Sequence, residues 1–595
     1  MKIQPKDRRA LLAAALGKTS CDLAVKNIKL VNLFTGEIYP ATVYIHQGFI
    51  VHVDDKNIEE DLAKAENVID GQGRYMTPGL IDAHIHIESS MMTPRNFASA
   101  VIPHGVLTVI TDPHEISNVF GEDAVHFMHD AGLDLPMHQF IDIPSCVPAV
   151  PGMEGSGAVF NADVVDRLAK LPNVIGLAEV MDYIGIANGG DRAMEFIEAA
   201  ERNNLYIQGH IIVPEGQERL LSAYLIGGPY SCHETTEPLE ARTKLRAGMY
   251  VDSRDSSIAK NVEAIWQGVK DLPWRERLCL CTDDREADEI QSTGQIDDVL
   301  RHIIKLGMDP LEALRACTVH SAQEAHIENL GMIAPGYTAD FLLVDDLHDF
   351  SVKSVWFAGK KVAEDGELIE PIPEKHFELE TRNSINAPKL SVEDFRLKAP
   401  KGAKDKVKVN VLCYPEAQSP ITYLSCEEIP VKDGYLDLSQ DKDLFYATII
   451  NRHGTGNRIV GVVRGFGAKC GADGSTVSHD CHNMGIVYKD AETGFAVYEE
   501  LKRIGGGFSC AKDGKVLCSL PLPCGGLMSN EKYPVVAKQS LAMKKALKEE
   551  LGMPQDNPML RIATMALPVI PDVKFSDLGL IDVFKQEFIP IFPEN

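Results

Sequence analysis

Between residues 79 and 329 the chain alternates short apolar segments with longer amphipathic segments, which is the pattern of parallel βα units. Eight strand-like segments can be counted, the number that closes a (β/α)8 barrel. They end near His86, Asp112, Asp142, Glu179, His210, His233, Asp252 and Asp283. Because the active site of such a barrel lies at the carboxyl ends of its strands, we expect the chemistry there.

Short β-branched segments separated by glycine-containing turns flank this region on both sides, at residues 22–76 and again at 339–360. Together they predict one small β-sandwich. Its first part, with an N-terminal helix, is residues 1–78, and its second part is residues 329–385. The barrel, residues 79–328, is inserted between the two parts.

Beyond Pro373 the sequence is loop-like until about Lys408, where strands resume. Residues 386–595 therefore predict a separate C-terminal α+β domain. The predicted fold is α/β, a metal-dependent (β/α)8 TIM barrel inserted in a small β-sandwich, plus this domain. The domain carries a polar cluster, His479-Asp480-Cys481-His482-Asn483. His479 and His482 could reach the active site or bind another ion, but we favour a buried turn, so that His479→Ala harms stability or assembly more than chemistry.

Composition and net charge narrow the kinds of molecule that this protein can bind. The 595 residues carry a net charge of -27, which disfavours nucleic acid and anionic membranes and favours a small substrate. No apolar stretch approaches the ~20 residues of a membrane span. Thirteen cysteines without a C-x-x-C pair indicate a reducing compartment, so we expect a cytoplasmic protein.

Two histidines end the first barrel strand, His84 and His86. Side chains at i and i+2 of a strand point the same way, so both imidazoles can reach one ion. A pair of ordinary strand histidines is the alternative. Imidazole suits zinc, iron, manganese or nickel, which leaves the identity of the ion open.

The ends of later strands supply further histidines and carboxylates. Taken together, these residues favour a metal site over separate structural roles. Taken singly, each could be a hydrogen-bonded core histidine or a carboxylate salt-bridged within the barrel. We predict that the set holds divalent metal, with two ions per subunit favoured over one. The predicted ligands are His84, His86, Glu179, His210, His233 and Asp283.

Acid–base and substrate-binding groups are expected around the same rim. Asp283 is placed to ligate metal and to take the proton of the attacking water, while Asp284 points to the other side of an ideal strand; their roles can be exchanged. His114 and Glu88 are predicted as catalytic acid–base groups, with support of the ligands as the alternative. The predicted substrate-binding residues are Asp112, Glu115 and Asp284. For Glu115 the alternative, slightly favoured, is support of the ligands, and for Asp284 it is an ion pair with Arg285.

Four segments carry a resemblance that covers nearly the whole chain. They are PGLIDAHIHIESSMMTP at 78–94, TDPHEI at 111–116, CTDDR at 281–285 and HDCHN at 479–483. They resemble the amidohydrolase superfamily, and more narrowly the bacterial and archaeal adenine deaminases. The resemblance implies hydrolytic deamination of adenine to hypoxanthine and ammonia in purine salvage, with manganese or iron, and sometimes zinc.

In the mechanism that this resemblance implies, a metal-activated hydroxide attacks C6 of the purine, a nearby acid protonates N1, and Asp283 carries the water proton to the amine. Many related barrels bridge two ions with a carboxylated lysine on the fourth strand, but residues 174–183 contain no lysine. Glu179 is then the candidate bridge, with binding of a substrate nitrogen as its alternative.

Two other functions are weighed against the deaminase. One is a cyclic amide hydrolase of the dihydropyrimidinase or dihydroorotase type, which the missing lysine disfavours. The other is a catalytically inactive barrel scaffold, which the complete ligand set disfavours. We expect a homodimer or higher homo-oligomer.

Overall fold

Eight parallel strands alternate with helices in the middle of the chain, as the apolar pattern predicts. They form two sheets, β6 to β10 and β11 to β13. Hydrogen bonds from Asp283 N to His84 O (3.0 Å) and from His86 N to Asp283 O (3.2 Å) join the end of β13 to that of β6. A hydrogen bond from Tyr230 N to Ile207 O (3.4 Å) joins the β11 side to β10, which closes the ring. The predicted barrel is confirmed. The strands are β6 (Leu80–Ile85), β7 (Val106–Thr111), β8 (His138–Ile143), β9 (Val174–Val180), β10 (Tyr206–Gly209), β11 (Ser231–Cys232), β12 (Tyr250–Arg254) and β13 (Leu278–Cys281).

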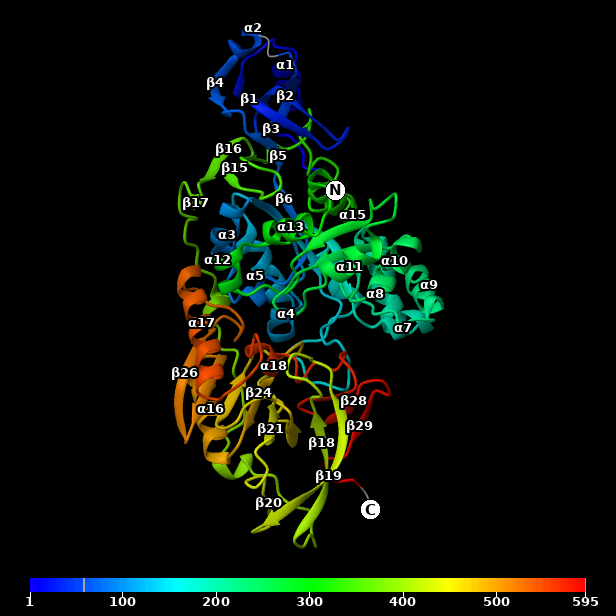
Figure 1. The fold of residues 1–595 in the computed structure, drawn as a ribbon, viewed down its shortest axis with the longest axis vertical. Helices are drawn as coiled ribbons and strands as arrows, with labels where there is room; N and C mark the ends of the chain where they lie inside the picture. The colour runs from blue at the N-terminus through cyan, green and yellow to red at the C-terminus, as the bar shows by residue number, and fades with distance from the viewer. Residues whose placement is uncertain (57–58, 594–595) are drawn as a thin grey trace.

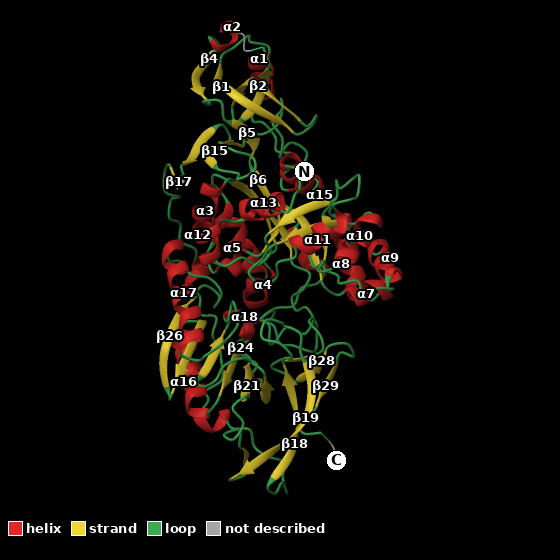
Figure 2. Ribbon diagram, in the orientation of Figure 1, coloured by secondary structure: helices red, strands yellow, loops and turns green. Residues whose placement is uncertain are grey.

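Helices surround these strands and cover their outer faces (Figure 2). Every residue of β6 and β7 is buried, as expected for strands covered on both faces. The helices are α3 (Pro94–Val101), α4 (His114–Phe120), α5 (Glu122–Gly132), α6 (Ala162–Leu168), α7 (Tyr183–Asn188), α8 (Asp191–Arg202), α9 (Glu218–Ile226), α10 (Pro238–Arg246), α11 (Val262–Val269), α12 (Ala287–Thr293), α13 (Ile296–Lys305), α14 (Pro310–Ala316) and α15 (Val319–Glu324), with 3-10 turns η1 (Ile87–Ser90) and η2 (Ile102–His104).

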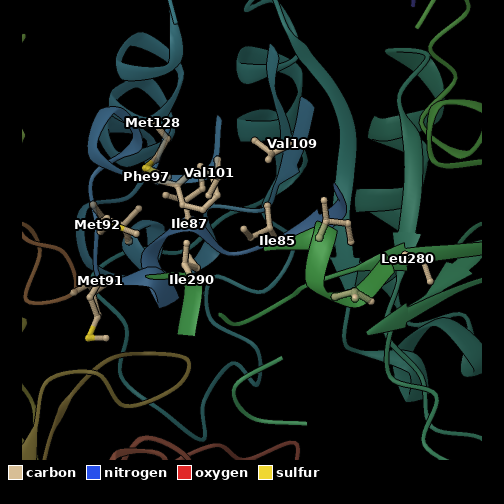
Figure 3. Close-up of a cluster of buried hydrophobic side chains, with 14 of the residues drawn as sticks. Ile85, Ile87, Met91, Met92, Phe97, Val101, Val109, Met128, Leu280 and Ile290 are labelled. Carbon is tan, nitrogen blue, oxygen red and sulfur yellow. The ribbon is translucent and has the colours of Figure 1, made fainter. Parts of the chain in front are cut away.

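A hydrophobic cluster anchors the end of β6. Figure 3 shows Phe97, Val101 and Met128 beside Ile87 in this cluster. Ile85 and Ile87 are both fully buried, and they alternate with His84 and His86 along the chain. Because the isoleucines are packed on one side, the histidines are held in position on the other.

The β segments on both sides of the barrel join in one nine-stranded sheet, in which β5 pairs with both β1 and β14. The sheet curls on itself around one core, and Ala339 N, just before β14, donates to Gly48 O (2.8 Å) in the turn between β2 and β3. Its elements are α1 (Arg8–Ala15), β1 (Cys21–Asn32), β2 (Glu37–His46), β3 (Phe49–Asp54), α2 (Glu59–Leu62), β4 (Ala65–Asp70), β5 (Tyr75–Pro78), β14 (Phe341–Val344), β15 (Val352–Phe357), β16 (Lys360–Glu364) and β17 (Glu367–Leu368).

The C-terminal domain contains a second nine-stranded sheet, β18 to β26, and a small three-stranded sheet. Its elements are η3 (Glu378–Thr381), η4 (Val392–Phe395), β18 (Lys406–Cys413), β19 (Tyr423–Lys432), β20 (Tyr435–Leu436), β21 (Leu444–Ile450), β22 (Arg458–Arg464), β23 (Ala472–Ser475), β24 (Met484–Tyr488), α16 (Ala491–Ile504), β25 (Gly507–Lys512), β26 (Lys515–Pro521), α17 (Tyr533–Glu549), α18 (Met559–Ala563), β27 (Val573–Phe575), β28 (Leu580–Asp582) and β29 (Glu587–Ile589).

The computed structural model, which describes residues 1–56 and 59–593, is elongated: the N-terminal sheet lies at one end, the barrel in the middle and the C-terminal domain at the other end (Figure 1). The C-terminal domain contacts the barrel through a β-bridge between Met92 and Ser529 and through Lys544 and Asp288. Within these residues no helix combines the length and apolarity needed to cross a membrane.

Candidate metal centre

His84 and His86 present two ring nitrogens to each other at the end of β6. The Nδ1 atom of His84 lies 2.8 Å from Gln208 Oε1, and that of His86 lies 2.9 Å from the backbone oxygen of Asp112. Both partners only accept hydrogen bonds, so each neutral ring carries its proton on Nδ1 and its lone pair on Nε2. The two Nε2 atoms are 3.1 Å apart. Two facing lone pairs are a donor set that fits a shared metal ion.

Asp283 completes this side of the site. Its Oδ1 atom lies 3.6 Å from His84 Nε2 and 3.3 Å from His86 Nε2. Its Oδ2 atom accepts a hydrogen bond from Arg254, which also pairs with both oxygens of Glu234 at 2.5 and 2.9 Å. Asp283 has a left-handed backbone with φ 57°, which costs on the order of 1 kcal/mol and turns its carboxylate to the histidines.

Glu179, at the end of β9, stands between two pairs of histidines. Its Oε2 atom contacts His210 Nδ1 and lies 3.1 Å from His233 Nε2. Its Oε1 atom lies 3.4 Å from His86 Nε2 and 3.5 Å from His114 Nδ1. Burial alone would raise the pKa of Glu179, but the neighbouring His210 and His233 lower that pKa well below its usual value. An ionised carboxylate with one oxygen toward each pair has the arrangement of a bridging ligand.

His114, at the start of α4, lies against this cluster. Its Nδ1 atom is 3.0 Å from Asp112 Oδ2, and its ring centroid is 4.6 Å from that of His86. On its other side, Nε2 lies 3.6 Å from Asp480 Oδ1 of the C-terminal domain. Asp112 is buried behind His114, so a direct substrate contact for Asp112 stays a prediction.

A group of three acids, the buried Glu88 and Glu115 and the half-buried Asp284, lies beside the metal-compatible cluster. Ser89 Oγ is 2.5 Å from Asp284 Oδ1 and 2.7 Å from Glu115 Oε1. One hydroxyl has a single proton, so it cannot donate to both carboxylates, and their close approach favours a proton on one of them. Burial and the charge of Asp283 raise the pKa of Asp284 to about 6.

Glu88 belongs to the same group. Burial and the neighbouring Glu115 raise the pKa of the Glu88 carboxyl to about 8. One of its oxygens accepts from Ile116 N at 3.3 Å, and the other has no hydrogen-bond partner among the described residues. A pKa raised in this way favours the protonated carboxyl, the form that can donate a proton.

A narrow cavity separates these acids from the C-terminal domain. Glu88, Ser89 and Asp284 line it on the barrel side. His479, Phe508 and Leu560 line it on the side of the C-terminal domain. Its volume of about 20 Å³ holds about one water molecule. The C-terminal domain thus covers the acidic side of the cluster.

The structure brings all six predicted ligands together and adds groups to which the sequence analysis gave no role: Gln208, Glu234, Arg254 and Asp480. Only spacing could have pointed to Gln208, which precedes His210 by two residues and is followed by Gly209 at the end of β10. Asp142, marked as a strand end, instead pairs with Tyr206 inside the barrel.

A closed (β/α)8 barrel with a buried histidine–carboxylate cluster at the carboxyl ends of its strands defines a metal-dependent hydrolase. Residues 75–362 match the model of the amidohydrolase family, and residues 419–587 match that of the adenine deaminase C-terminal domain. The chain is 37% identical to the adenine deaminase of Halalkalibacterium halodurans, with 97% of each chain covered. It is 36% identical to those of Moorella thermoacetica and Geobacillus kaustophilus, with 98% of each chain covered. The chain belongs to the adenine deaminase family.

Proposed function

We propose that this protein hydrolyses adenine to hypoxanthine and ammonia, a reaction of purine salvage. The observation that carries the proposal is the position of Glu179 between two histidine pairs, at the mouth of a barrel that is followed by an adenine deaminase C-terminal domain. Hydrolytic deamination needs water activated at neutral pH and an acid for the ring nitrogen. The cluster and Glu88 supply residues for both needs.

The donor set fits two divalent ions. His84, His86 and Asp283 would hold one of them, His210 and His233 the other, and Glu179 would contact both. Bound there, a divalent ion supplies Lewis acidity, lowering the pKa of its water from 15.7 to about 7. We propose manganese or iron as the native metal, with zinc as the alternative.

The chain's own residues then handle protons. Asp283, with one oxygen fixed by Arg254, accepts the proton of the attacking water at Oδ1 and passes it toward the departing amine. Glu88, whose raised pKa favours the protonated carboxyl, donates to N1 of the base. Ser89, Glu115 and Asp284 orient the base, and the C-terminal domain excludes bulk water from the cavity.

Activity on adenine is compared with activity on hydantoin, using metal-loaded protein. We expect ammonia and hypoxanthine in equal amounts from adenine and no ring opening of hydantoin. Ring opening of hydantoin without ammonia from adenine would instead identify a cyclic amide hydrolase. Neither reaction, together with no bound metal and no gain on adding manganese or iron, would identify an inactive scaffold. His84→Ala is the inactive control.

We further propose, on sequence grounds, a cytoplasmic homodimer or higher homo-oligomer. Light scattering after size-exclusion chromatography measures the mass directly. A monomer at micromolar concentration would contradict the oligomer.

A further inference from the structure

The loop between β23 and β24 projects from the C-terminal domain onto the barrel mouth, and its backbone is firmly held. His479 N donates to Ala563 O at 3.0 Å, and His482 N donates to Ser478 O at 2.8 Å. The buried Arg452 donates from Nε to His482 O at 2.5 Å. The loop therefore has a fixed conformation and can present a side chain accurately.

His479 presents its ring to the cavity without a hydrogen bond of its own. Its Nδ1 atom lies 3.8 Å from Glu115 Oε1 and 3.8 Å from Asp480 Oδ1, beyond hydrogen-bond distance. No other side chain in the part of the chain that the structure describes hydrogen-bonds this ring. The side chain is only 9% exposed and lines the cavity with Glu88 and Asp284. A nearly buried imidazole with free nitrogens needs a partner, and the cavity is where that partner can lie.

A metal ion is not the partner that this arrangement fits. Glu115, His479 and His482 have ligand atoms close enough to share an ion. However, His482 Nδ1 accepts a hydrogen bond from Ser478 N at 3.2 Å, so its proton is on Nε2, the atom that faces Glu115. A protonated nitrogen has no lone pair for a metal. His482 belongs to the loop structure, which leaves His479 to contact an organic ligand.

The rest of the cavity suits a flat, polar-edged ring. Phe508, Leu560 and Val477 give the side formed by the C-terminal domain an apolar surface, while Glu88, Ser89 and Asp284 form the polar side. A purine has apolar faces and nitrogen atoms at its edge, so its edge complements both sides. The present volume of about 20 Å³ admits only such an edge, and the barrel and the C-terminal domain must move apart to admit the whole base.

We propose that His479 is a specificity-determining residue of the substrate site, which hydrogen-bonds a nitrogen of the five-membered ring of the purine. This inference rests on the proposed function. Asp284 follows the ligand Asp283 in sequence, Ser89 links Asp284 to Glu115, and Glu115 faces His479. These contacts run from the metal ligands through Asp284, Ser89 and Glu115 to His479, so His479 is the member farthest along from the metal ligands. The carbon that bears the amino group must lie near those ligands, which directs the five-membered ring to His479.

The test compares His479→Gln and His479→Phe with His376→Gln, an exposed histidine elsewhere. KM and kcat are measured on adenine, and the Kd of hypoxanthine is measured with metal-loaded protein. We expect KM and Kd to rise about tenfold in His479→Phe, with kcat changed less than about threefold. Gln keeps a donor and an acceptor, so its effect is smaller. The unfolding midpoint stays that of the wild type, in contrast to the loss of stability that the sequence pattern predicts for His479→Ala.

Analogues of adenine identify the nitrogen. 7-Deazaadenine lacks the N7 acceptor, and 9-methyladenine lacks the N9 proton. The wild type should disfavour one of them relative to adenine, and His479→Phe should lose that discrimination. Equal discrimination by wild type and variant for both analogues would contradict the contact.

Three outcomes distinguish failure of the proposed role of His479 from failure of the proposed function. Unchanged KM and Kd in both variants would overturn the role of His479 while leaving the deaminase intact. A lower unfolding midpoint with a lower kcat at constant KM would assign His479 to stability alone and overturn the role equally. A wild type that neither deaminates adenine nor binds hypoxanthine would overturn the proposed function and this inference with it.

Discussion

Glu179 is the side chain on which the two halves of the proposed metal centre depend, because one of its oxygens faces His210 and His233 and the other faces His86. Glu179→Gln keeps the shape and removes the charge. We expect bound metal to fall by about half or more and activity to fall more than about a hundredfold. Metal analysis of protein purified without chelators measures the first effect. Full metal content in the variant would contradict a bridging role, and Glu198→Gln on the exposed face of α8 is the control.

Gln208 accepts the Nδ1 proton of His84 and would act on a bound metal through that ring. Gln208→Leu removes the acceptor and frees the ring to change its tautomer. We expect metal affinity to fall about 10- to 100-fold, with activity largely restored by excess metal. A metal titration followed by activity gives both values. An unchanged metal Kd would show that the hydrogen bond does not orient His84.

At the scale of single residues, the sequence predicts the roles of side chains whose chemistry is distinctive. It does not predict the roles of side chains that act only through a partner. The spacing of His84 and His86 places both imidazoles on one face of a strand, which is what the structure has. Gln208 and Arg254 read as ordinary strand residues, because an amide or a guanidinium reveals its role only through its partner.

Strand β23 carries a buried acid with a measurable consequence. Neither oxygen of Asp473 has a hydrogen-bond partner among the described residues, and burial raises the pKa of this carboxyl to about 8. In the unfolded chain an aspartate has a pKa of about 3.9. As pH rises between these values, the unfolded state loses the proton while the native state keeps it. Stability therefore falls over this range and levels off above pH of about 8.

Asp473→Asn removes this titration. We expect the variant to gain stability relative to wild type by roughly 3 kcal/mol between pH 5.5 and 8.5. Urea unfolding of both proteins at the two pH values measures the gain. Asp513→Asn, at an exposed turn, should show no such dependence. A gain that is the same at both pH values would show that Asp473 is ionised in the native state.

Strands marked by clear apolar runs were predictable from the sequence, but the pairing of the strands in the C-terminal sheet was not. The barrel strands follow from apolar runs joined by short connections, because each strand pairs with its neighbours in sequence. In the C-terminal sheet, β18 pairs with β19 on one side and with β22 on the other, in parallel. Such non-local pairing depends on contacts between distant segments, which a local pattern does not record.

The whole molecule depends on the junction between barrel and C-terminal domain. Lys544 of α17 contacts Glu286 and lies 2.7 Å from Asp288 Oδ2, and all three side chains are largely buried. The sequence predicts a barrel and a separate domain but not this contact, because complementary charges so far apart in the chain have no local signature. A reach of His479 and His482 to the active site was one alternative from the sequence, but no local pattern indicates that the C-terminal domain covers the site.

Lys544→Met leaves two buried acids without their cation, which costs about 3–5 kcal/mol. We expect faster hydrogen exchange in α12 and in residues 475–483, and a higher KM for adenine, because the junction also positions the cavity. Lys545→Met, whose lysine is largely exposed, is the matched control. Equal exchange in the two variants would show that the ion pair does not hold the domains together.

Anomalous diffraction from crystals of the active protein, recorded at the manganese and iron absorption edges, tests the metal centre most directly. We expect anomalous density within bonding distance of His84, His86 and Asp283, and a second peak beside His210 and His233, with Glu179 in contact with both. Metal-loaded, active protein without anomalous density among these residues would contradict the account.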